Sequence, residues 1–135
     1  MSTGYSGTPL AKKLGAKNGQ RTWHLAMPKS VLEEILEAGV MPEIVRSPAV
    51  GLEMAHLFVT ERSVLAKELK RLRGLLAREG TVWVSWPKKA AKVPTDVTED
   101  VVRAEALPLG FVDVKVCAVD AVWSGLKLVI RKSER

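Results

Sequence analysis

The sequence predicts a three-layer α/β/α fold, in which a mainly parallel sheet carries helices on both faces and ends in an antiparallel hairpin. Segments with the apolar spacing of a helix alternate along the chain with short apolar segments of strand length. The longest helical segment is followed almost at once by a strand, which is typical of a β-α-β unit. The last two strand-like segments, residues 111–120 and 126–131, are separated by a short turn and therefore form the hairpin.

The composition is that of a globular protein: of 135 residues, 47% are hydrophobic and 27% are charged. We expect a single domain over residues 1–135, with an N-terminal loop and a short helix in residues 1–20. No apolar run approaches the ~20 residues of a membrane span, and no signal-peptide pattern is present. The single cysteine, Cys117, excludes an internal disulfide and a multi-cysteine metal site. We therefore expect a cytoplasmic protein without membrane contact.

The formal net charge is +6, and the basic residues are spread along the chain. Five of them lie on the expected long helix of residues 63–79, at Lys67, Lys70, Arg71, Arg73 and Arg78. A positive field favours anionic partners, nucleic acid among them. A solvated basic surface without a partner accounts for the same pattern. The charge alone leaves both interpretations open.

The first expected element is a short helix over residues 8–15, preceded by a loop that contains Tyr5. Thr8 suits the N-cap because its hydroxyl can accept a free backbone N–H, and Pro9 suits the first helical position. Gly15 suits the left-handed residue that ends a helix.

A strand over residues 21–27 follows and is stopped by Pro28. Ser30 and Glu33 have the spacing of a capping box, which predicts the start of a second helix, and Gly39 predicts its end.

Two strands are expected next, over residues 43–46 and 54–60, with a loop at residues 47–53 between them. Parallel strands of one sheet need a crossover connection, and this loop is short for one. Its path is the open question in the predicted topology.

The longest helix is expected to run from an N-cap at Ser63 to Glu79, before Gly80, because its leucines recur at spacings of three and four. The strand over residues 81–86 comes directly after it and is rich in valine and tryptophan. Strands of this composition are buried on both faces, so we expect it inside the sheet, parallel to the strand of residues 54–60.

Asp96 or Thr98 suits the N-cap of a last helix, which we expect to end at Leu107. Strict alternation over residues 111–120 predicts a half-buried strand, whose inward face is formed by Val112, Val114, Val116 and Ala118. A turn at residues 124–125 then leads into the final strand. The expected strand order is 2-1-3-4-6-5, with the last strand antiparallel.

Several strings in the chain resemble a family of small bacterial proteins known only as a domain of unknown function. They are GYSGTPL at residues 4–10, WVSWPKK at 83–89, and VDVKVCAVD at 112–120 followed by WSGLK at 123–127. The resemblance implies a small bacterial protein with no assigned reaction and no established cofactor. The order of long helix, strand and terminal hairpin also looks like part of a class I methyltransferase-type Rossmann domain, here truncated.

Dehydrogenases and methyltransferases of that fold bind their cofactors at a glycine-rich turn after the first strand, where bare backbone can approach the ligand. Here the corresponding residues are Ala26, Met27, Pro28 and Lys29. At the end of the second strand Arg46 stands where an acidic residue would hold a ribose. We therefore expect no cofactor, and no tight binding of S-adenosylmethionine or NAD.

The candidate ligand site lies beyond the strand of residues 81–86 and comprises Ser85, Trp86, Lys88, Lys89 and Thr98. Ligands of open α/β sheets collect at the carboxyl ends of the parallel strands. Two ammonium groups next to the start of a helix would attract a phosphate or carboxylate, because the first helical N–H groups are free. An exposed basic loop beside a core tryptophan explains the same residues.

Other reactive side chains form no recognised constellation. His24 and His56 lack metal-ligand spacing, and Cys117 is expected to be a packed thiol. Ser85 and Ser124 lack the strained turn of a hydrolase nucleophile. We expect Asp113 and Lys115, which share a strand face, to form a surface ion pair.

Three functions remain open. The first is a non-catalytic or degenerate Rossmann-like module that binds a small anion or a protein partner. The second is a nucleic-acid-associated protein that uses the basic long helix, and the third is a divergent small-molecule transferase.

Overall fold

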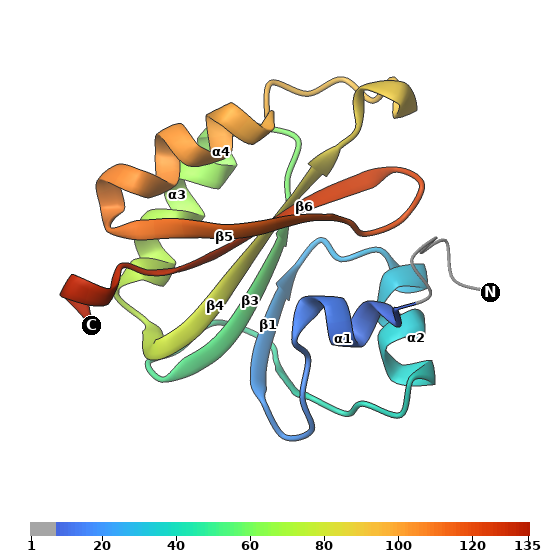
Figure 1. Cartoon of the computed structure of the whole chain (residues 1–135), viewed down its shortest axis with the longest axis horizontal. Coiled ribbons are helices and arrows are strands. Elements are labelled where there is room, and N and C mark those ends of the chain that lie inside the picture. The colour runs from blue at the N-terminus through green and yellow to red at the C-terminus, as the bar shows by residue number, and fades with distance from the viewer. Residues whose placement is uncertain (1–7) are drawn as a thin grey trace.

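The computed structural model describes residues 8–135, so the expected loop around Tyr5 lies outside the described residues. A six-stranded sheet crosses the molecule, with helices on both of its faces (Figure 1). Helices α1 (Leu10–Leu14) and α2 (Lys29–Glu37) cover one face, and α3 (Arg62–Arg73) and α4 (Glu99–Ala106) cover the other. The predicted α/β/α layering is confirmed. We refer to the two sides as the α1/α2 face and the α3/α4 face.

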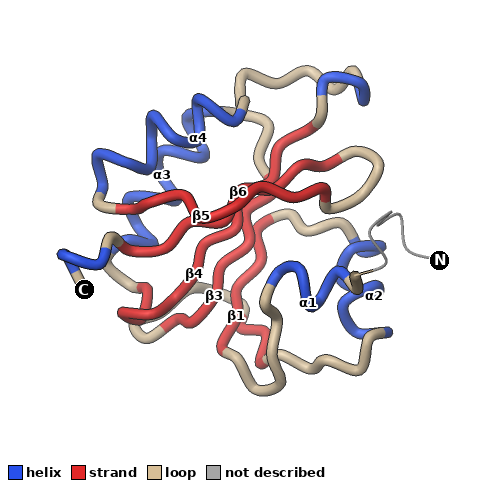
Figure 2. The backbone as a smooth tube through the Cα atoms, in the orientation of Figure 1, coloured by secondary structure: helices blue, strands red, loops and turns tan. Residues whose placement is uncertain are grey.

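The strand order is β2-β1-β3-β4-β6-β5, as predicted. The strands are β1 (Arg21–Leu25), β2 (Glu43–Val45), β3 (Leu52–Phe58), β4 (Leu76–Pro87), β5 (Phe111–Ala118) and β6 (Trp123–Ile130). Strands β2, β1, β3 and β4 pair in parallel, and β6 is antiparallel to both of its neighbours (Figure 2). Strand β4 therefore lies inside the sheet beside β3, as its composition predicted.

Strand β4 supplies both cores because its side chains alternate between the two faces. Val82 and Val84 are fully buried in the larger core under α3 and α4. Trp83 is fully buried in the smaller core under α1 and α2, where its indole N–H donates to the carbonyl oxygen of Leu14 at 2.8 Å. A strand buried on both faces requires the unbroken apolar run that the sequence shows.

The prediction of one long helix from Ser63 to Glu79 was wrong at both ends. Helix α3 begins at Arg62, whose backbone N–H donates to the Asp96 carboxylate at 2.7 Å, and it ends at Arg73. Gly74 caps it, and β4 begins only two residues later, at Leu76. Glycine weakens a helix, whereas the leucines after it fit a buried strand equally well. The register of β3 with β4 shifts between Leu52 and Met54, so β4 bulges over residues 77–80.

Two of the expected helix starts also differ from the structure. Helix α1 has Pro9 at its N-cap, and α2 has Pro28 there, with no capping hydrogen bond from a side chain in either case. Ser30 lies within the first turn of α2, so the predicted capping box does not form. The prediction for α4 is confirmed, since the Thr98 hydroxyl accepts the N–H of Val101 at 3.2 Å. Gly15 ends α1 in the left-handed conformation, with φ of 74°.

The terminal hairpin turns earlier than predicted. Its turn precedes Trp123, because the Asp120 carboxylate accepts the N–H groups of both Val122 and Trp123 at 2.8 Å. Residues 124–125 consequently lie within β6 and pair with β4. Val114 and Val116, predicted to be buried, are about half exposed (52% and 47%), because β5 is the edge strand and carries a register shift after residue 113.

The short connection from β2 to β3 crosses β1 on the α3/α4 face without a helix. The indole N–H of Trp23 donates to the carbonyl oxygen of Arg46 at 3.3 Å, and the Arg71 guanidinium lies 5.5 Å from the Trp23 ring centroid. Strand β2 has only three residues, so the connection has to return over roughly 10 Å to reach the start of the parallel strand β3. This length explains why a loop suffices here. Within residues 8–135, no helix has the length and apolar content to traverse a bilayer.

Candidate functional site

A cavity of about 340 Å³ lies beyond the carboxyl end of β4, and we call it the carboxyl-edge cavity. Four of the five predicted site residues line it: Trp86, Lys88, Lys89 and Thr98. Strand β4 contributes Trp86 to the lining, and the loop that leads to α4 contributes Thr95, Val97 and Thr98. This loop is held in place by the Thr95 hydroxyl, which donates to the carbonyl oxygen of Thr60 at 2.7 Å.

Ser85, the fifth predicted residue, lies elsewhere. It is fully buried on the α1/α2 face, where its hydroxyl oxygen is 2.7 Å from Nε2 of His56. Adjacent residues of a strand point to opposite faces of the sheet, so Ser85 and Trp86 cannot serve one cavity through their side chains. The structure thus separates Ser85 from the other four residues.

The two lysines of the cavity have different environments. The Lys88 ammonium donates to the carbonyl oxygen of Asp120 at 2.7 Å, and the Lys88 backbone N–H donates to Val122 at 2.8 Å. Lys88 therefore fastens the β5–β6 turn to the end of β4. The exposed Lys89 begins a short 3₁₀ helix (Lys89–Ala91), and its ammonium has no ion pair or hydrogen bond within residues 8–135.

The start of α4 carries both favourable and unfavourable charge for an anion. Its first N–H groups are available, but Glu99 and Asp100 occupy the first turn. Arg103 compensates part of this negative charge through ion pairs with Glu99 at 2.5 Å and with Asp113 at 2.9 Å. The Arg103 hydrogen bond lowers the pKa of Asp113 from its ordinary value. Asp113 thus pairs with Arg103 on α4, while the expected Asp113–Lys115 pair does not form.

No protein-family model and no curated protein matches this chain. Solved structures do match. An S-adenosylmethionine-dependent methyltransferase from Aquifex aeolicus superposes with a TM-score of 0.60 at 14% identity, over 90% of this chain and 87% of the other. Fibrillarin from Aeropyrum pernix, solved with natively bound S-adenosyl-L-methionine, gives a TM-score of 0.52 at 14% identity, over 94% and 71%. A putative type 11 methyltransferase from Sulfolobus solfataricus gives a TM-score of 0.55 at 14% identity, over 84% and 72%.

The chain has a methyltransferase-type Rossmann-like fold. At these identities the likeness shows the fold alone, and the resemblance to a bacterial family of unassigned function stays a prediction. Many Rossmann-like proteins that share a fold do different chemistry, so function has to be argued from the site.

The first turn of this Rossmann-like fold carries side chains where related folds have glycines. Ala26 adopts a left-handed conformation, with φ of 56°, at the position where β1 leads into α2. The backbone therefore bends as a glycine would, but Ala26 places a methyl group there, followed by Met27 and Pro28. Arg46 stands at the end of β2, as the sequence indicated. The turn therefore lacks the glycines that let bare backbone approach a dinucleotide in related folds.

His56 and Ser85 form a buried pair that was not predicted from the sequence. Both side chains are buried, and the His56 ring stacks on Phe58 with centroids 4.4 Å apart. Burial, and secondarily the charge of His24, lowers the pKa of His56 to about 3. His56 is therefore neutral at physiological pH, and its Nδ1 has no partner within the described residues. The contact between His56 and Ser85 depends on the register of β3 against β4, in which Phe58 pairs with Ser85. This register cannot be read from the sequence of either strand alone.

The other candidate residues, Cys117 and His24, do not indicate a second functional site. Burial raises the pKa of the half-buried Cys117 thiol, so it is a weak nucleophile. Burial also lowers the pKa of His24. Among residues 8–135, no group of histidine, cysteine or acidic side chains is arranged to hold a metal ion.

The basic residues of the expected long helix are dispersed by the fold. Arg71 lies over Trp23 and pairs with Glu68, and Arg73 donates to the carbonyl oxygen of Leu109 at 2.9 Å. Arg78 is in the bulged part of β4 and does not belong to the helix. Two arginines are thus used for internal contacts, which weakens the case for a nucleic-acid surface on α3.

Proposed function

We propose that this protein is a Rossmann-like module that binds a small anionic ligand in the carboxyl-edge cavity. The observation that carries the proposal is the convergence of Trp86, Lys88, Lys89 and Thr98 on one cavity beyond an inner parallel strand. Ligands of open α/β sheets bind at this edge, which supports the assignment. The volume of about 340 Å³ falls in the range of small-molecule sites.

Each lining residue has a defined part in this proposal. The Lys89 ammonium supplies positive charge that no other described group uses, and Thr98, the N-cap of α4, lines the same cavity. Trp86 is only 7% exposed and offers an apolar wall. Lys88 keeps the β5–β6 turn in place and so shapes the cavity. A phosphate or a carboxylate is the chemical group that these residues would hold.

The test is calorimetric titration of the whole chain with inorganic phosphate and with citrate. We expect Lys89→Ala to weaken the binding of the better anion about fivefold or more, because a partly exposed charge-assisted hydrogen bond is lost. Lys70→Ala is the matched control, since it removes the same charge from an exposed position on α3. Equal affinity in Lys89→Ala and the parent protein would overturn the proposal.

A transferase is the second candidate, and the fold is the observation that favours it. The superposing structures include an S-adenosylmethionine-dependent methyltransferase, a methyltransferase from Pyrococcus furiosus and a fibrillarin with bound S-adenosyl-L-methionine. The side chains at the first turn argue against that cofactor here, as described for Ala26. Titration with S-adenosylmethionine distinguishes the two candidates. A transferase of this kind must bind the cofactor, whereas an anion-binding module does not need it.

A further inference from the structure

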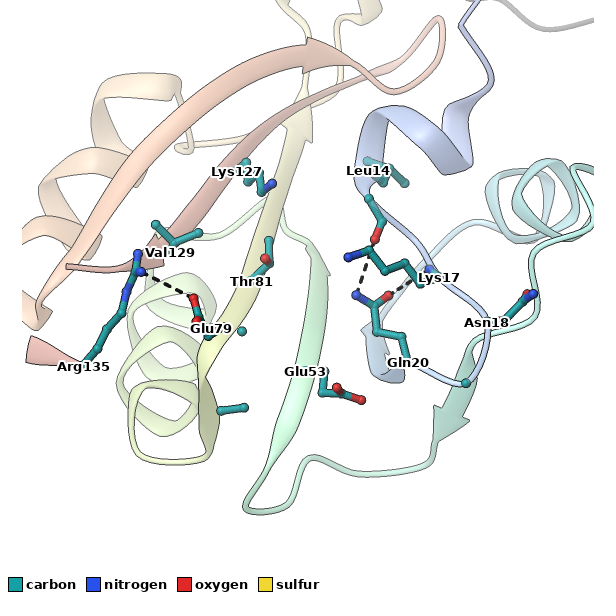
Figure 3. A pocket seen from close by; sticks show the side chains of 14 residues that line it. Leu14, Lys17, Asn18, Gln20, Glu53, Glu79, Thr81, Lys127, Val129 and Arg135 are labelled. Atoms are coloured by element: carbon teal, nitrogen blue, oxygen red, sulfur yellow. Dashed lines mark hydrogen bonds and ion pairs between the residues drawn. The ribbon is translucent and has the colours of Figure 1, made fainter. Parts of the chain in front are cut away.

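A second cavity lies at the opposite edge of the sheet (Figure 3). It has a volume of about 530 Å³ and opens at the amino ends of the parallel strands, on the α1/α2 face. Thr81 of β4 and Lys127 of β6 line its sheet side, and the connection from α1 to β1 (residues 15–20) lies across from them. We call it the amino-edge cavity. It shares no lining residue with the carboxyl-edge cavity.

Two irregularities of the chain create this space. Helix α1 has only five residues and ends at Gly15, so it does not cover the amino ends of β3 and β4. Strand β4 bulges at residues 77–80, where a Cβ on Gly80 would come within 2.6 Å of the Leu76 side chain. The bulge therefore depends on glycine at this position. β-Bulges commonly lie beside binding sites because they redirect the chain around a ligand.

The wall opposite the sheet is fixed before any ligand arrives. The Gln20 amide donates to the carbonyl oxygen of Gly15 at 3.4 Å and accepts the backbone N–H of Lys17 at 3.3 Å. Asn18 accepts the N–H of Met41 at 2.8 Å, and Gly19 donates to the Met41 carbonyl oxygen at 2.9 Å. A preformed wall lowers the entropy that a ligand must lose on binding.

The uncompensated charge of the cavity is positive. Glu53 accepts the backbone N–H of Arg21 at 2.8 Å, and Glu79 pairs with Arg135 at 3.6 Å. By contrast, the ammonium groups of Lys17 and Lys127 have no hydrogen bond or ion pair within residues 8–135. The acidic groups are thus already engaged, whereas both lysines are available to a ligand.

A third lysine, Lys115, is the neighbour of Lys127 in the sheet. Lys127 pairs with Lys115 across β5 and β6, so two ammonium-bearing side chains start from neighbouring positions of the sheet. Like charges at such a position repel, and the fold gains nothing from them. A bound anion would relieve that repulsion.

We propose that the amino-edge cavity binds a small hydroxylated anion, of the size of a sugar phosphate or a sugar acid. Lys127 and Lys17 would hold the phosphate or carboxylate group. The Thr81 hydroxyl and the carboxylate oxygen of Glu53 that does not accept the Arg21 N–H offer partners for ligand hydroxyls. A volume of about 530 Å³ is larger than a bare phosphate needs and suits a ligand of this size.

The experiment is calorimetric titration of the whole chain with three probes: glucose 6-phosphate, gluconate and uncharged glucose. We expect at least one of the two anions to bind and glucose not to bind. Lys127→Ala should weaken the binding of that anion about fivefold or more. Lys17→Ala, in a surface loop, should weaken it as well and covers the case in which Lys127→Ala fails to fold.

Two control variants separate this site from the carboxyl-edge cavity. Lys70→Ala, at an exposed position on α3, should leave the affinity for the anion unchanged. Lys89→Ala reports on the carboxyl-edge cavity, and it should not remove the binding that depends on Lys127 and Lys17. If only Lys89→Ala weakens binding, the anion occupies the carboxyl-edge cavity, and the amino-edge proposal is overturned while the proposed function stands. The absence of binding for both sugar anions, or unchanged affinity in both Lys127→Ala and Lys17→Ala, would also overturn it.

Discussion

Nε2 of His56 lies 2.7 Å from the hydroxyl oxygen of Ser85, and both side chains are closed off from solvent between β3, β4 and the helices of the α1/α2 face. One nitrogen of the ring is thereby bonded and the other is buried without a partner among the described residues. A buried imidazole of this kind resists protonation, because a charge there would lose its hydration.

This pair predicts how stability depends on pH. The pKa of His56 is about 3 in the folded protein and near 6.5 in an unfolded chain. Between these values the unfolded state binds more protons, so stability is full above about pH 6.5 and falls as the pH drops toward 3. Urea unfolding at pH 7 and pH 5 should show a loss of about 2 kcal/mol from this residue.

The matching variant is His56→Leu combined with Ser85→Ala, which removes both polar groups and leaves no hydroxyl without a partner. Its loss of stability between pH 7 and pH 5 should be smaller by about 2 kcal/mol. His24 remains and contributes in the same direction, because burial lowers its pKa too. An undiminished pH dependence in the double variant would show that His56 is protonated in the folded state.

Lys88 and Lys89 should differ in their effect on stability. Lys88→Ala loses the hydrogen bond to the Asp120 carbonyl oxygen and should destabilise the protein by about 1–2 kcal/mol. Lys89→Ala removes an exposed side chain and should change stability by less than about 0.5 kcal/mol. Thermal unfolding measures both, and equal melting temperatures for the two variants would contradict the assignment.

Gly125 lies where β6 crosses the buried pair. A Cβ at this position would meet the Val119 side chain at 3.1 Å and the Ser85 hydroxyl and Trp83 ring at 3.3 Å. We therefore expect Gly125→Ala to cost about 1–3 kcal/mol through overpacking. Gly74→Ala is the control, because its Cβ would meet nothing closer than 3.9 Å and should cost little. The denaturant midpoints of the two variants measure this difference in stability, and equal midpoints would contradict the prediction.

The side chains of the first turn predict that the protein does not bind nucleotide cofactors tightly. The apo protein should not bind S-adenosylmethionine or NAD with a micromolar dissociation constant, because Ala26, Met27 and Pro28 fill the turn with side chains. Calorimetric titration with each molecule checks this. A micromolar constant for S-adenosylmethionine would favour the transferase candidate instead.

The strand order could be predicted because each strand was marked by its own residues and helical segments alternate with the parallel strands. The end of α3 could not, because Leu75 and Leu76 continue the helical spacing past Gly74, and only the pairing of β4 with β3 decides between helix and strand. The hairpin turn was misplaced for a related reason. Ser124 and Gly125 are common in turns, but the Asp120 side chain bonds the backbone earlier.

Part of the candidate site was visible in the sequence and part was not. Trp86, Lys88, Lys89 and Thr98 could be grouped because they flank one loop beyond one strand. Sequence alone did not reveal that Lys88 is bound to a carbonyl oxygen. The amino-edge cavity was also beyond reach, because it depends on a bulge and on segments far apart in the chain.

The position of β6 has a consequence for biosynthesis. Strand β5 is made before β6, yet it reaches the sheet only through β6, which pairs with β4 on one side and β5 on the other. Until β6 has emerged from the ribosome, one edge of β4 has unpaired backbone groups, and β5 has no strand to join. Such an edge is a template for association between nascent chains. Docking of the β5–β6 hairpin therefore completes the sheet and pairs the exposed edge of β4 in a single step.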